Sequence, residues 1–198
     1  MDAISVLKDD HKLVKKLFRE FEETTDRAVK TRERLSGRIV KELSVHAAIE
    51  EEILYPRLRE ALQKGDRLAD HALDEHQHAK ELLARIEDMS GDSPELAETM
   101  GELIQAITAH VEEEEGDVFK QLREAVGRDD LTRWGDELRA AKKTAPTRPH
   151  PHAPDKPPAN VLVGAVAAVL DRARDLTSPS TRWLADRWRG AQRRWRRA

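Results

Sequence analysis

The sequence predicts an all-α protein, an up-down-up-down four-helix bundle followed by a Pro-rich linker and a basic, Trp-containing helical tail. Composition favours helices, because Lys, Arg, Glu and Asp make up 37% of the 198 residues and alternate with Leu, Ile and Ala, whereas aromatic residues make up 4%. Apolar residues also recur at steps of three and four in four stretches, which is the period of one helix face. Short connections between these stretches favour antiparallel neighbours.

The first predicted helix runs from Ile4 to about Asp26, with its apolar stripe at steps of three and four. The second runs from about Arg32 to Lys64, and Gly65 is expected to end it. The third stripe covers residues 68–86 and stops at the Ser-Gly-Asp sequence that follows.

The fourth helix is expected to begin with Ser93 as N-cap and Pro94 at its first position, and to run to Gly127. A shorter helix is predicted from Asp130 to Lys143. We find no internal repeat beyond two His-x-x-x-Glu motifs. The predicted divisions are a bundle over 1–126, an additional helix within 127–143, a Pro-rich linker over 144–159 and a basic amphipathic tail over 160–198.

Each of the four helices carries one histidine where its stripe predicts a core residue, and two of these histidines are followed four residues later by glutamate. Residues i and i+4 share one helix face, so each pair points an imidazole and a carboxylate into the same interior. Burying so many ionisable groups is costly unless a cation compensates. The predicted metal ligands are His11, His46, Glu50, His76, His110 and Glu114.

The four histidines are also predicted to lie in one layer of the bundle. Counted from the helix ends at one end of the bundle, they fall 14 to 16 residues away. This spread of two residues corresponds to roughly 3 Å at the rise of an α-helix. Both glutamates then lie about one turn below the histidines.

The chain has no cysteine, so any metal must be held by imidazole and carboxylate groups. Four imidazoles and two carboxylates exceed the needs of one tetrahedral zinc ion but suit two six-coordinate ions bridged by the carboxylates. We expect two iron ions, with manganese or zinc less favoured. Positions that the protein leaves vacant would take an oxo or hydroxo bridge, water or a diatomic molecule.

The order of these motifs resembles the hemerythrin-like, or HHE cation-binding, family of non-haem di-iron four-helix bundles. The resemblance covers roughly residues 1–126 and rests on an early His, HAAIE at 46–50, DEHQH at 74–78, and HVEEE from residue 110, with EEEILYP at 50–56. It implies that the four histidines are iron ligands and that Glu50 and Glu114 bridge the two ions.

The chain departs from the oxygen-carrying members of that family. These use a fifth histidine on the third helix, four residues from the other, where this chain has Ala72 and Lys80. One iron is then short of a protein ligand, which solvent or a neighbour such as Glu113 would supply. An under-ligated iron suits reactivity or sensing better than oxygen storage.

The resemblance implies reaction with O2, peroxide or NO in oxidative or nitrosative protection or in sensing. As an enzyme, the protein would decompose peroxide as catalases do. The alternative is a non-enzymatic iron or oxygen sensor, or an interaction module. A purely structural bundle and a ferritin-like oxidase are less favoured, the latter because that architecture uses Glu-x-x-His and more carboxylates than histidines.

Several neighbouring residues are expected to lie outside the site. Tyr55 sits half a helical revolution from His46, which argues against a role as ligand or radical. His71 and His78 are expected to be exposed, and His150 and His152 are expected to have no functional role. The charge runs predict a solvated face for Glu51, Glu52, Glu112 and Glu115.

The chain start has no apolar signal segment, and its longest apolar run, 161–170, is about half of the roughly 20 residues that span a bilayer. We therefore expect a cytoplasmic protein. Residues 181–198 are predicted to form a basic amphipathic helix, with an apolar stripe that contains Trp188 and Trp195 and with arginines on the other side. This helix could hold the protein at a membrane surface or bind an acidic protein partner. Nucleic acid is a less favoured partner. The alternative is that this segment docks on the acidic bundle or stays disordered until bound.

Overall fold

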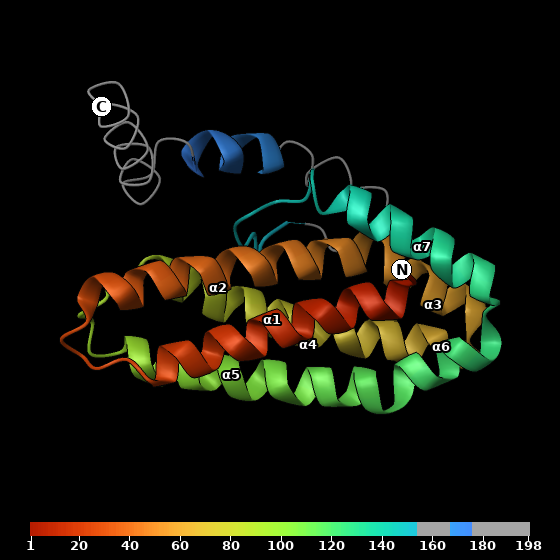
Figure 1. Ribbon diagram of the computed structural model, residues 1–198, viewed down its shortest axis with the longest axis horizontal. Helices are drawn as coiled ribbons and strands as arrows, with labels where there is room; N and C mark the ends of the chain where they lie inside the picture. Colours follow the sequence, from red (N-terminus) through yellow and green to blue (C-terminus); the bar gives the residue numbers. More distant parts are fainter. Residues whose placement is uncertain (154–166, 176–198) are drawn as a thin grey trace, which may run out of the picture.

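The computed structural model describes residues 1–153 and 167–175. These residues form helices and connecting turns without strands, which confirms the predicted all-α class. The long helices lie side by side along the long axis of the molecule (Figure 1). They are α1 (Ala3–Glu22), α2 (Val29–Ile49), α4 (Gly65–Glu87) and α5 (Leu96–Glu113). No helix in the described part of the chain has the length and apolar character needed to cross a bilayer.

Helices α2 and α5 each continue through a short π-helical segment. The first, η1 (Glu50–Leu54), leads into α3 (Tyr55–Ala61), and the second, η2 (Glu114–Val118), leads into α6 (Phe119–Ala125). The backbone N–H of the residue after each segment donates to the carbonyl of its first glutamate, five residues earlier. Because a π turn holds more residues than an α turn, side chains beyond it face a direction that α periodicity does not predict.

These two interrupted helices form a repeat that the sequence analysis missed. From His46 and from His110 the order is the same: a glutamate four residues on begins a π segment of 5 residues, and a 7-residue helix follows that begins with an aromatic residue and ends in Leu-Arg-Glu-Ala. Seven of the 16 positions in 46–61 and 110–125 are identical, including the second glutamate (Glu51 and Glu115), so the repeat is present in the sequence as well as in the local structure. The prediction of no repeat beyond His-x-x-x-Glu was wrong.

Two residues predicted to mark helix ends, Gly65 and Ser93, do not do so in the structure. Gly65 does not end the second helix but begins α4, after a turn that follows Ala61. A Cβ atom on Gly65 would lie 2.0 Å from the carbonyl oxygen of Leu58, so the close approach of α3 and α4 requires glycine there. Ser93 does not cap α5, because its hydroxyl donates to the carboxylate of Glu95, which is itself the N-cap residue.

The apolar core is divided into two clusters. One cluster lies at the end of the bundle that holds α3 and α6, and it includes Ile4, Tyr55 and Phe119. The other lies toward the α1–α2 and α4–α5 turns, and it includes Phe18 and Ile107. Along α1, α2 and α4 the predicted ligand histidine falls between the residues of the two clusters, and after α5 the first cluster resumes at Val118, beyond His110. A layer of polar groups therefore separates two apolar regions.

The additional helix predicted over 130–143 is observed as α7 (Arg128–Ala141), which packs along α1. Its buried face includes Leu131, Trp134 and Leu138, which join the first apolar cluster. At Gly135 a Cβ atom would lie 2.3 Å from the carbonyl oxygen of Met1, so glycine lets α7 approach the chain start.

Beyond α7, the described residues of the predicted linker are held against a helical stretch at 167–175. The buried Asp171 carboxylate accepts from the N–H groups of Thr147 and Arg148, at 3.0 and 3.1 Å. His150, for which no role was expected, lies with Nε2 3.1 Å from the same carboxylate oxygen. The tail segment 181–198 and its predicted partners lie outside the described residues.

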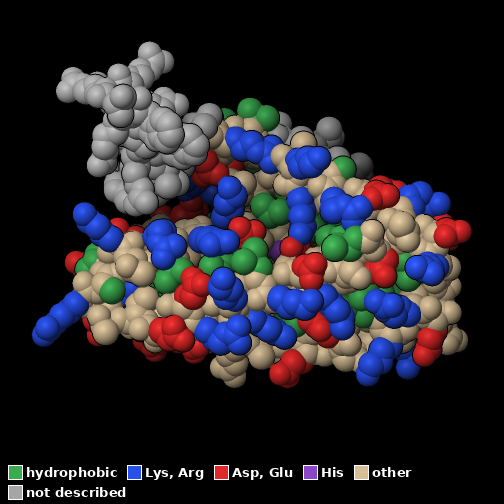
Figure 2. Space-filling view, viewed as in Figure 1, with side chains coloured by type: hydrophobic (Ala, Val, Ile, Leu, Met, Phe, Trp, Pro, Cys, Tyr) green, Lys and Arg blue, Asp and Glu red, His purple; other side chains and the backbone are tan. Residues whose placement is uncertain are grey.

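The surface carries charges of both signs. Figure 2 shows Lys and Arg side chains intermixed with Asp and Glu over the face in view. Pairs one helical turn apart, such as Lys16 with Glu20 on α1, account for part of this pattern. Glu52 and Glu112 are exposed, as the charge runs predicted. The other two glutamates of that prediction are part of the site.

Candidate metal centre

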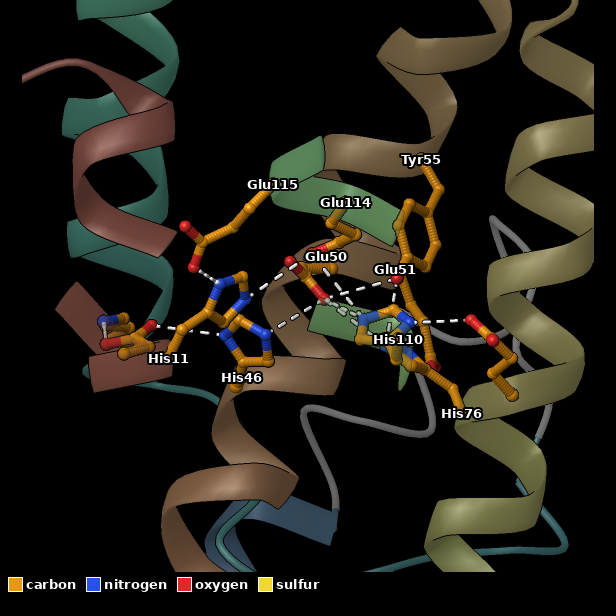
Figure 3. A network of polar contacts seen from close by, with 12 residues as sticks. His11, His46, Glu50, Glu51, Tyr55, His76, His110, Glu114 and Glu115 are labelled. Atoms are coloured by element: carbon orange, nitrogen blue, oxygen red, sulfur yellow. Dashed lines mark hydrogen bonds and ion pairs between the residues drawn. The ribbon is translucent and has the colours of Figure 1, made fainter. Parts of the chain in front are cut away.

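The six residues predicted as metal ligands come together in the polar layer between the two apolar clusters (Figure 3). Each is at most 5% exposed. The imidazole rings of His11 and His46 lie 5.0 Å apart between centroids, and those of His76 and His110 lie 4.9 Å apart. The chain thus brings together groups that it draws from four helices.

The donor atoms form two groups, and Glu50 belongs to both. In the first group, atoms of His11, His46, Glu50 and Glu114 all lie within 4.8 Å of one another, and in the second group the same holds for Glu50, His76 and His110. Oε2 of Glu50 is 3.3 Å from Nε2 of His46 and 3.4 Å from Nε2 of His76. Oε2 of Glu114 is 3.5 Å from Nε2 of His11 and 3.6 Å from Nε2 of His110. Each carboxylate therefore lies close to a histidine of both groups.

Several of these buried polar atoms have no hydrogen-bond partner among the described residues. They are Nε2 of His11, His46 and His110, Oε1 of Glu50, and both carboxylate oxygens of Glu114. A buried donor or acceptor left without a partner costs about 1–3 kcal/mol, and charged groups cost more. Bound cations would satisfy all of these atoms at once, so the donor set fits a metal centre with nitrogen and oxygen ligands.

The other nitrogen of each imidazole, Nδ1, faces a carboxylate on the outer side of the layer. The pairs are His11 with Glu115 (3.0 Å), His46 with Asp10 (3.4 Å), His76 with Glu51 (3.0 Å) and His110 with Glu75 (2.8 Å). A carboxylate in this position accepts a hydrogen bond from Nδ1–H, which keeps the proton on Nδ1 and leaves the lone pair on Nε2. All four imidazoles are therefore oriented with Nε2 toward the interior, as metal ligands require.

Three of these outer carboxylates are in turn paired with a lysine. Lys8 lies 3.2 Å from Glu115, Lys80 lies 2.7 Å from Glu51, and Lys142 of the turn after α7 contacts Asp10. The prediction of a solvated role for Glu51 and Glu115 was wrong. Both directly follow the interior glutamate of their motif, and each holds a histidine of a neighbouring helix. The doubled glutamate in His-x-x-x-Glu-Glu is the sequence signal that could have identified them.

Tyr55 also belongs to the site, contrary to the prediction from α periodicity. Its hydroxyl oxygen lies 2.9 Å from Nε2 of His76 and 3.3 Å from Oε2 of Glu50 (Figure 3). The π turn of η1 rotates Tyr55 into the interior, which a uniform α-helix from His46 would not do. The corresponding residue after η2 is Phe119, whose ring stacks on His11 with 6.0 Å between centroids.

Glu113, considered above as a source of the missing ligand, faces away from the centre. It is exposed, and its carboxylate lies 3.3 Å from Nε2 of His71 on the outside of the bundle. The protein oxygen that lies beside the second group is instead the phenol of Tyr55. His71 and His78 are exposed, as predicted.

The two interior carboxyl groups differ in acidity. Burial and the nearby Glu114 raise the pKa of Glu50 well above its ordinary value. Burial also raises the pKa of Glu114, but contacts with His110 and His11 outweigh it and bring that pKa to about 2. Burial lowers the pKa of His46 to about 4, so this imidazole is neutral and its Nε2 is available as a donor to metal.

Burial lowers the pKa values of His11 and His110, but contacts with Glu114 and with the outer carboxylates outweigh it and leave both raised. The metal-free layer therefore shares protons among groups that a bound cation would deprotonate.

The fold and this donor set define a helical-bundle domain with a histidine–carboxylate cluster suited to metal ions. The chain belongs to the hemerythrin HHE cation-binding domain family, whose model matches residues 2–122. The family assignment suggested by the sequence motifs is thus confirmed. Domains of this family bind metal ions, typically iron.

Comparisons with individual proteins agree with this assignment. A hemerythrin-like protein of Schizosaccharomyces pombe is 28% identical over 168 residues, which cover 84% of this chain and 82% of that protein. The crystal structure of a hemerythrin HHE cation-binding domain-containing protein from Mycobacterium kansasii matches with a TM-score of 0.62 and 25% identity, over 72% of this chain and 86% of that one. A DNA nickase of a Nostoc species is 34% identical over 142 residues, which make up 72% of this chain but 39% of the nickase.

Proposed function

We propose that this protein holds two iron ions in the polar layer and that this di-iron centre reacts with O2, peroxide or NO, in oxidative or nitrosative protection or in sensing. The observation that carries the proposal is the pairing of donor groups. Each group contains two histidines, and Glu50 and Glu114 span both. Shared carboxylates hold two cations close together, which is the arrangement needed to act on one small ligand.

A small apolar cavity beside the imidazoles supports the choice of ligand. It has a volume of about 20 Å³, and its walls include Val14, Phe18, Leu83 and Ile107 from the second apolar cluster. All four ligand histidines also line it. A space of this size admits a water-sized or diatomic molecule and excludes a larger substrate. Its apolar walls favour O2 or NO over ions.

The iron ions, when bound, would supply the electrons exchanged with the ligand. The chain fixes their environment. Glu50 and Glu114 set the separation of the two positions, while the outer carboxylates hold the imidazoles in the orientation for binding. Tyr55 places a hydroxyl beside the second group, where it can donate a proton or complete the ligand set. Phe119 closes the same side of the first group with an apolar ring.

As an enzyme, the protein would be a peroxide-decomposing one, with the same residues in the same roles. The cavity supports peroxide as well as diatomic ligands, because hydrogen peroxide is small and uncharged. DNA nicking is not part of the proposal, since the match covers a minor part of the nickase that bears this name.

The test is to load the purified full-length protein anaerobically with Fe²⁺ and to measure bound iron by elemental analysis and optical absorption. We expect two iron ions per chain and an absorption change on addition of O2, H2O2 or NO. His46→Ala and His110→Ala each remove a donor from a different group, so each variant is expected to bind less iron. Full iron binding by both variants, or loaded protein that responds to none of the three ligands, would contradict the proposal.

A further inference from the structure

One of the four outer carboxylates has a different environment from the others. Glu115, Asp10 and Glu51 each contact a lysine, which neutralises the carboxylate that holds a histidine of the centre. Glu75, which holds His110, contacts no Lys or Arg in the part of the chain that the structure describes. Its outward oxygen faces His71 instead.

A second acidic side chain joins this pair on the surface. Nε2 of His71 lies 3.6 Å from Oε1 of Glu75 and 3.3 Å from Oε2 of Glu113. His71 and Glu75 share one face of α4 at positions i and i+4, and Glu113 is the last residue of the neighbouring α5. The three donor atoms lie within 4.8 Å of one another. Two helices thus present one imidazole nitrogen and two carboxylate oxygens to solvent.

No Lys or Arg among the described residues balances the charge of this trio. The two carboxylates bring two negative charges, whereas an imidazole brings at most one positive charge. Among the described residues, neither carboxylate forms an ion pair with Lys or Arg. A divalent cation would complement the trio, and imidazole with carboxylate oxygen is a donor set that Zn²⁺ and similar ions accept.

We propose that His71, Glu75 and Glu113 form a third, solvent-exposed binding site for a divalent transition-metal ion, separate from the buried centre. Three protein ligands leave further coordination positions to water, as in exchangeable rather than closed sites. The side chains are 55%, 26% and 42% exposed, so an ion reaches them without opening the bundle.

The two oxygens of Glu75 connect this outer site to the buried one. Oε1 belongs to the outer trio, and Oε2 accepts from Nδ1 of His110 at 2.8 Å. A cation on Oε1 withdraws electron density from the carboxylate and weakens the bond to His110. In this respect the ion occupies the place that a lysine takes at the other three outer carboxylates.

The test uses Zn²⁺ as the probe, added to iron-loaded full-length protein and followed by titration calorimetry, with iron content measured before and after. We expect one equivalent of Zn²⁺ per chain to bind without release of iron. The double variant His71→Gln, Glu113→Gln is expected to weaken this binding at least tenfold. The matched control is His78→Gln, Glu112→Gln, which changes the same residue types at exposed positions of the same helices.

The control is expected to bind Zn²⁺ as the unchanged protein does, and the single variant His71→Gln shows whether the imidazole itself is needed. The absence of this equivalent in the unchanged protein would overturn the proposal, as would equal binding in the double variant. Displacement of iron by Zn²⁺ without a further equivalent would do the same, because it would place the ion in the buried layer.

Discussion

Two adjacent glutamates allow a sharp test of how the outer carboxylates support the centre. Glu51 is 6% exposed, lies 3.0 Å from Nδ1 of His76, and contacts Lys80. Glu52, the next residue, is exposed. Glu51→Gln removes one negative charge and keeps the side-chain volume, so it weakens the contact with His76 and leaves Lys80 without its charge partner. Glu52→Gln makes the same chemical change on the surface.

The expected effect of Glu51→Gln is a loss of metal affinity. Replacing the group that orients a ligand histidine costs roughly 10–100-fold in affinity in metalloproteins. This corresponds to about 1.4–2.8 kcal/mol of binding free energy. The effect on binding is expected mainly in the second donor group, because His76 belongs to that group alone. Glu52→Gln is expected to leave the affinity within about twofold.

The assay is competition for Fe²⁺ against a chelator of known affinity, with each variant compared with the unchanged protein. Circular dichroism and the midpoint of urea unfolding check that the metal-free variants keep the fold. Equal affinities for Glu51→Gln and Glu52→Gln, with both folds intact, would refute the assigned role of the outer carboxylate. Equal losses in both variants would point to the total charge of the α2 terminus instead.

Four further outcomes are expected. Tyr55→Phe removes a hydroxyl bonded to the buried Nε2 of His76 and should destabilise the metal-free protein by about 1–3 kcal/mol in urea unfolding, whereas an unchanged midpoint would exclude this bond. Gly65→Ala forces a Cβ atom against the backbone of α3 and should lower the free energy of unfolding by about 1–3 kcal/mol or more. Gly101→Ala adds a Cβ atom that meets no atom within 4 Å, so it should raise the free energy of unfolding by roughly 0.5–1 kcal/mol. Metal uptake should release protons, and metal affinity should increase as pH rises, because the interior groups with raised pKa values must lose protons to bind metal. Calorimetry in buffers of different ionisation enthalpy measures this release. No proton release would show that the layer was already deprotonated. Chelation should lower the melting temperature, since free metal at 100 times its Kd adds about 2.7 kcal/mol to the folded state, and an unchanged melting temperature would show that metal does not bind the folded layer.

Much of the site could be predicted because the α-helical period holds from the helix starts to the interior glutamates. His46 and Glu50, and likewise His110 and Glu114, occupy one face of a regular α-helix, so counting residues placed them correctly. The count fails beyond these glutamates, because η1 begins at Glu50 and η2 begins at Glu114. Tyr55 was misplaced for this reason alone. Single-residue propensities do not distinguish a π turn from an α turn. The repeat of the whole segment is the sequence pattern that indicates the π turn.

The outer carboxylates were missed for a different reason. Glu51 and Glu115 stand in runs of acidic residues, and most members of such runs face solvent, as Glu52 and Glu112 do. Their partners, His76 and His11, lie on other helices. Which member of a run turns inward therefore depends on how the helices meet, and periodicity along one helix cannot show it. The position directly after each interior glutamate, shared by both halves of the repeat, is the pattern that could have marked them.

The duplicated segment has one further consequence for the chemistry of the pair. Tyr55 and Phe119 hold corresponding places after η1 and η2, and they differ by a single oxygen atom. Two otherwise matched halves therefore offer unlike surroundings: a hydroxylated wall on one side and a hydrocarbon wall on the other. The two donor groups are therefore chemically inequivalent, because the hydroxyl of Tyr55 lies beside His76 whereas the ring of Phe119 stacks on His11.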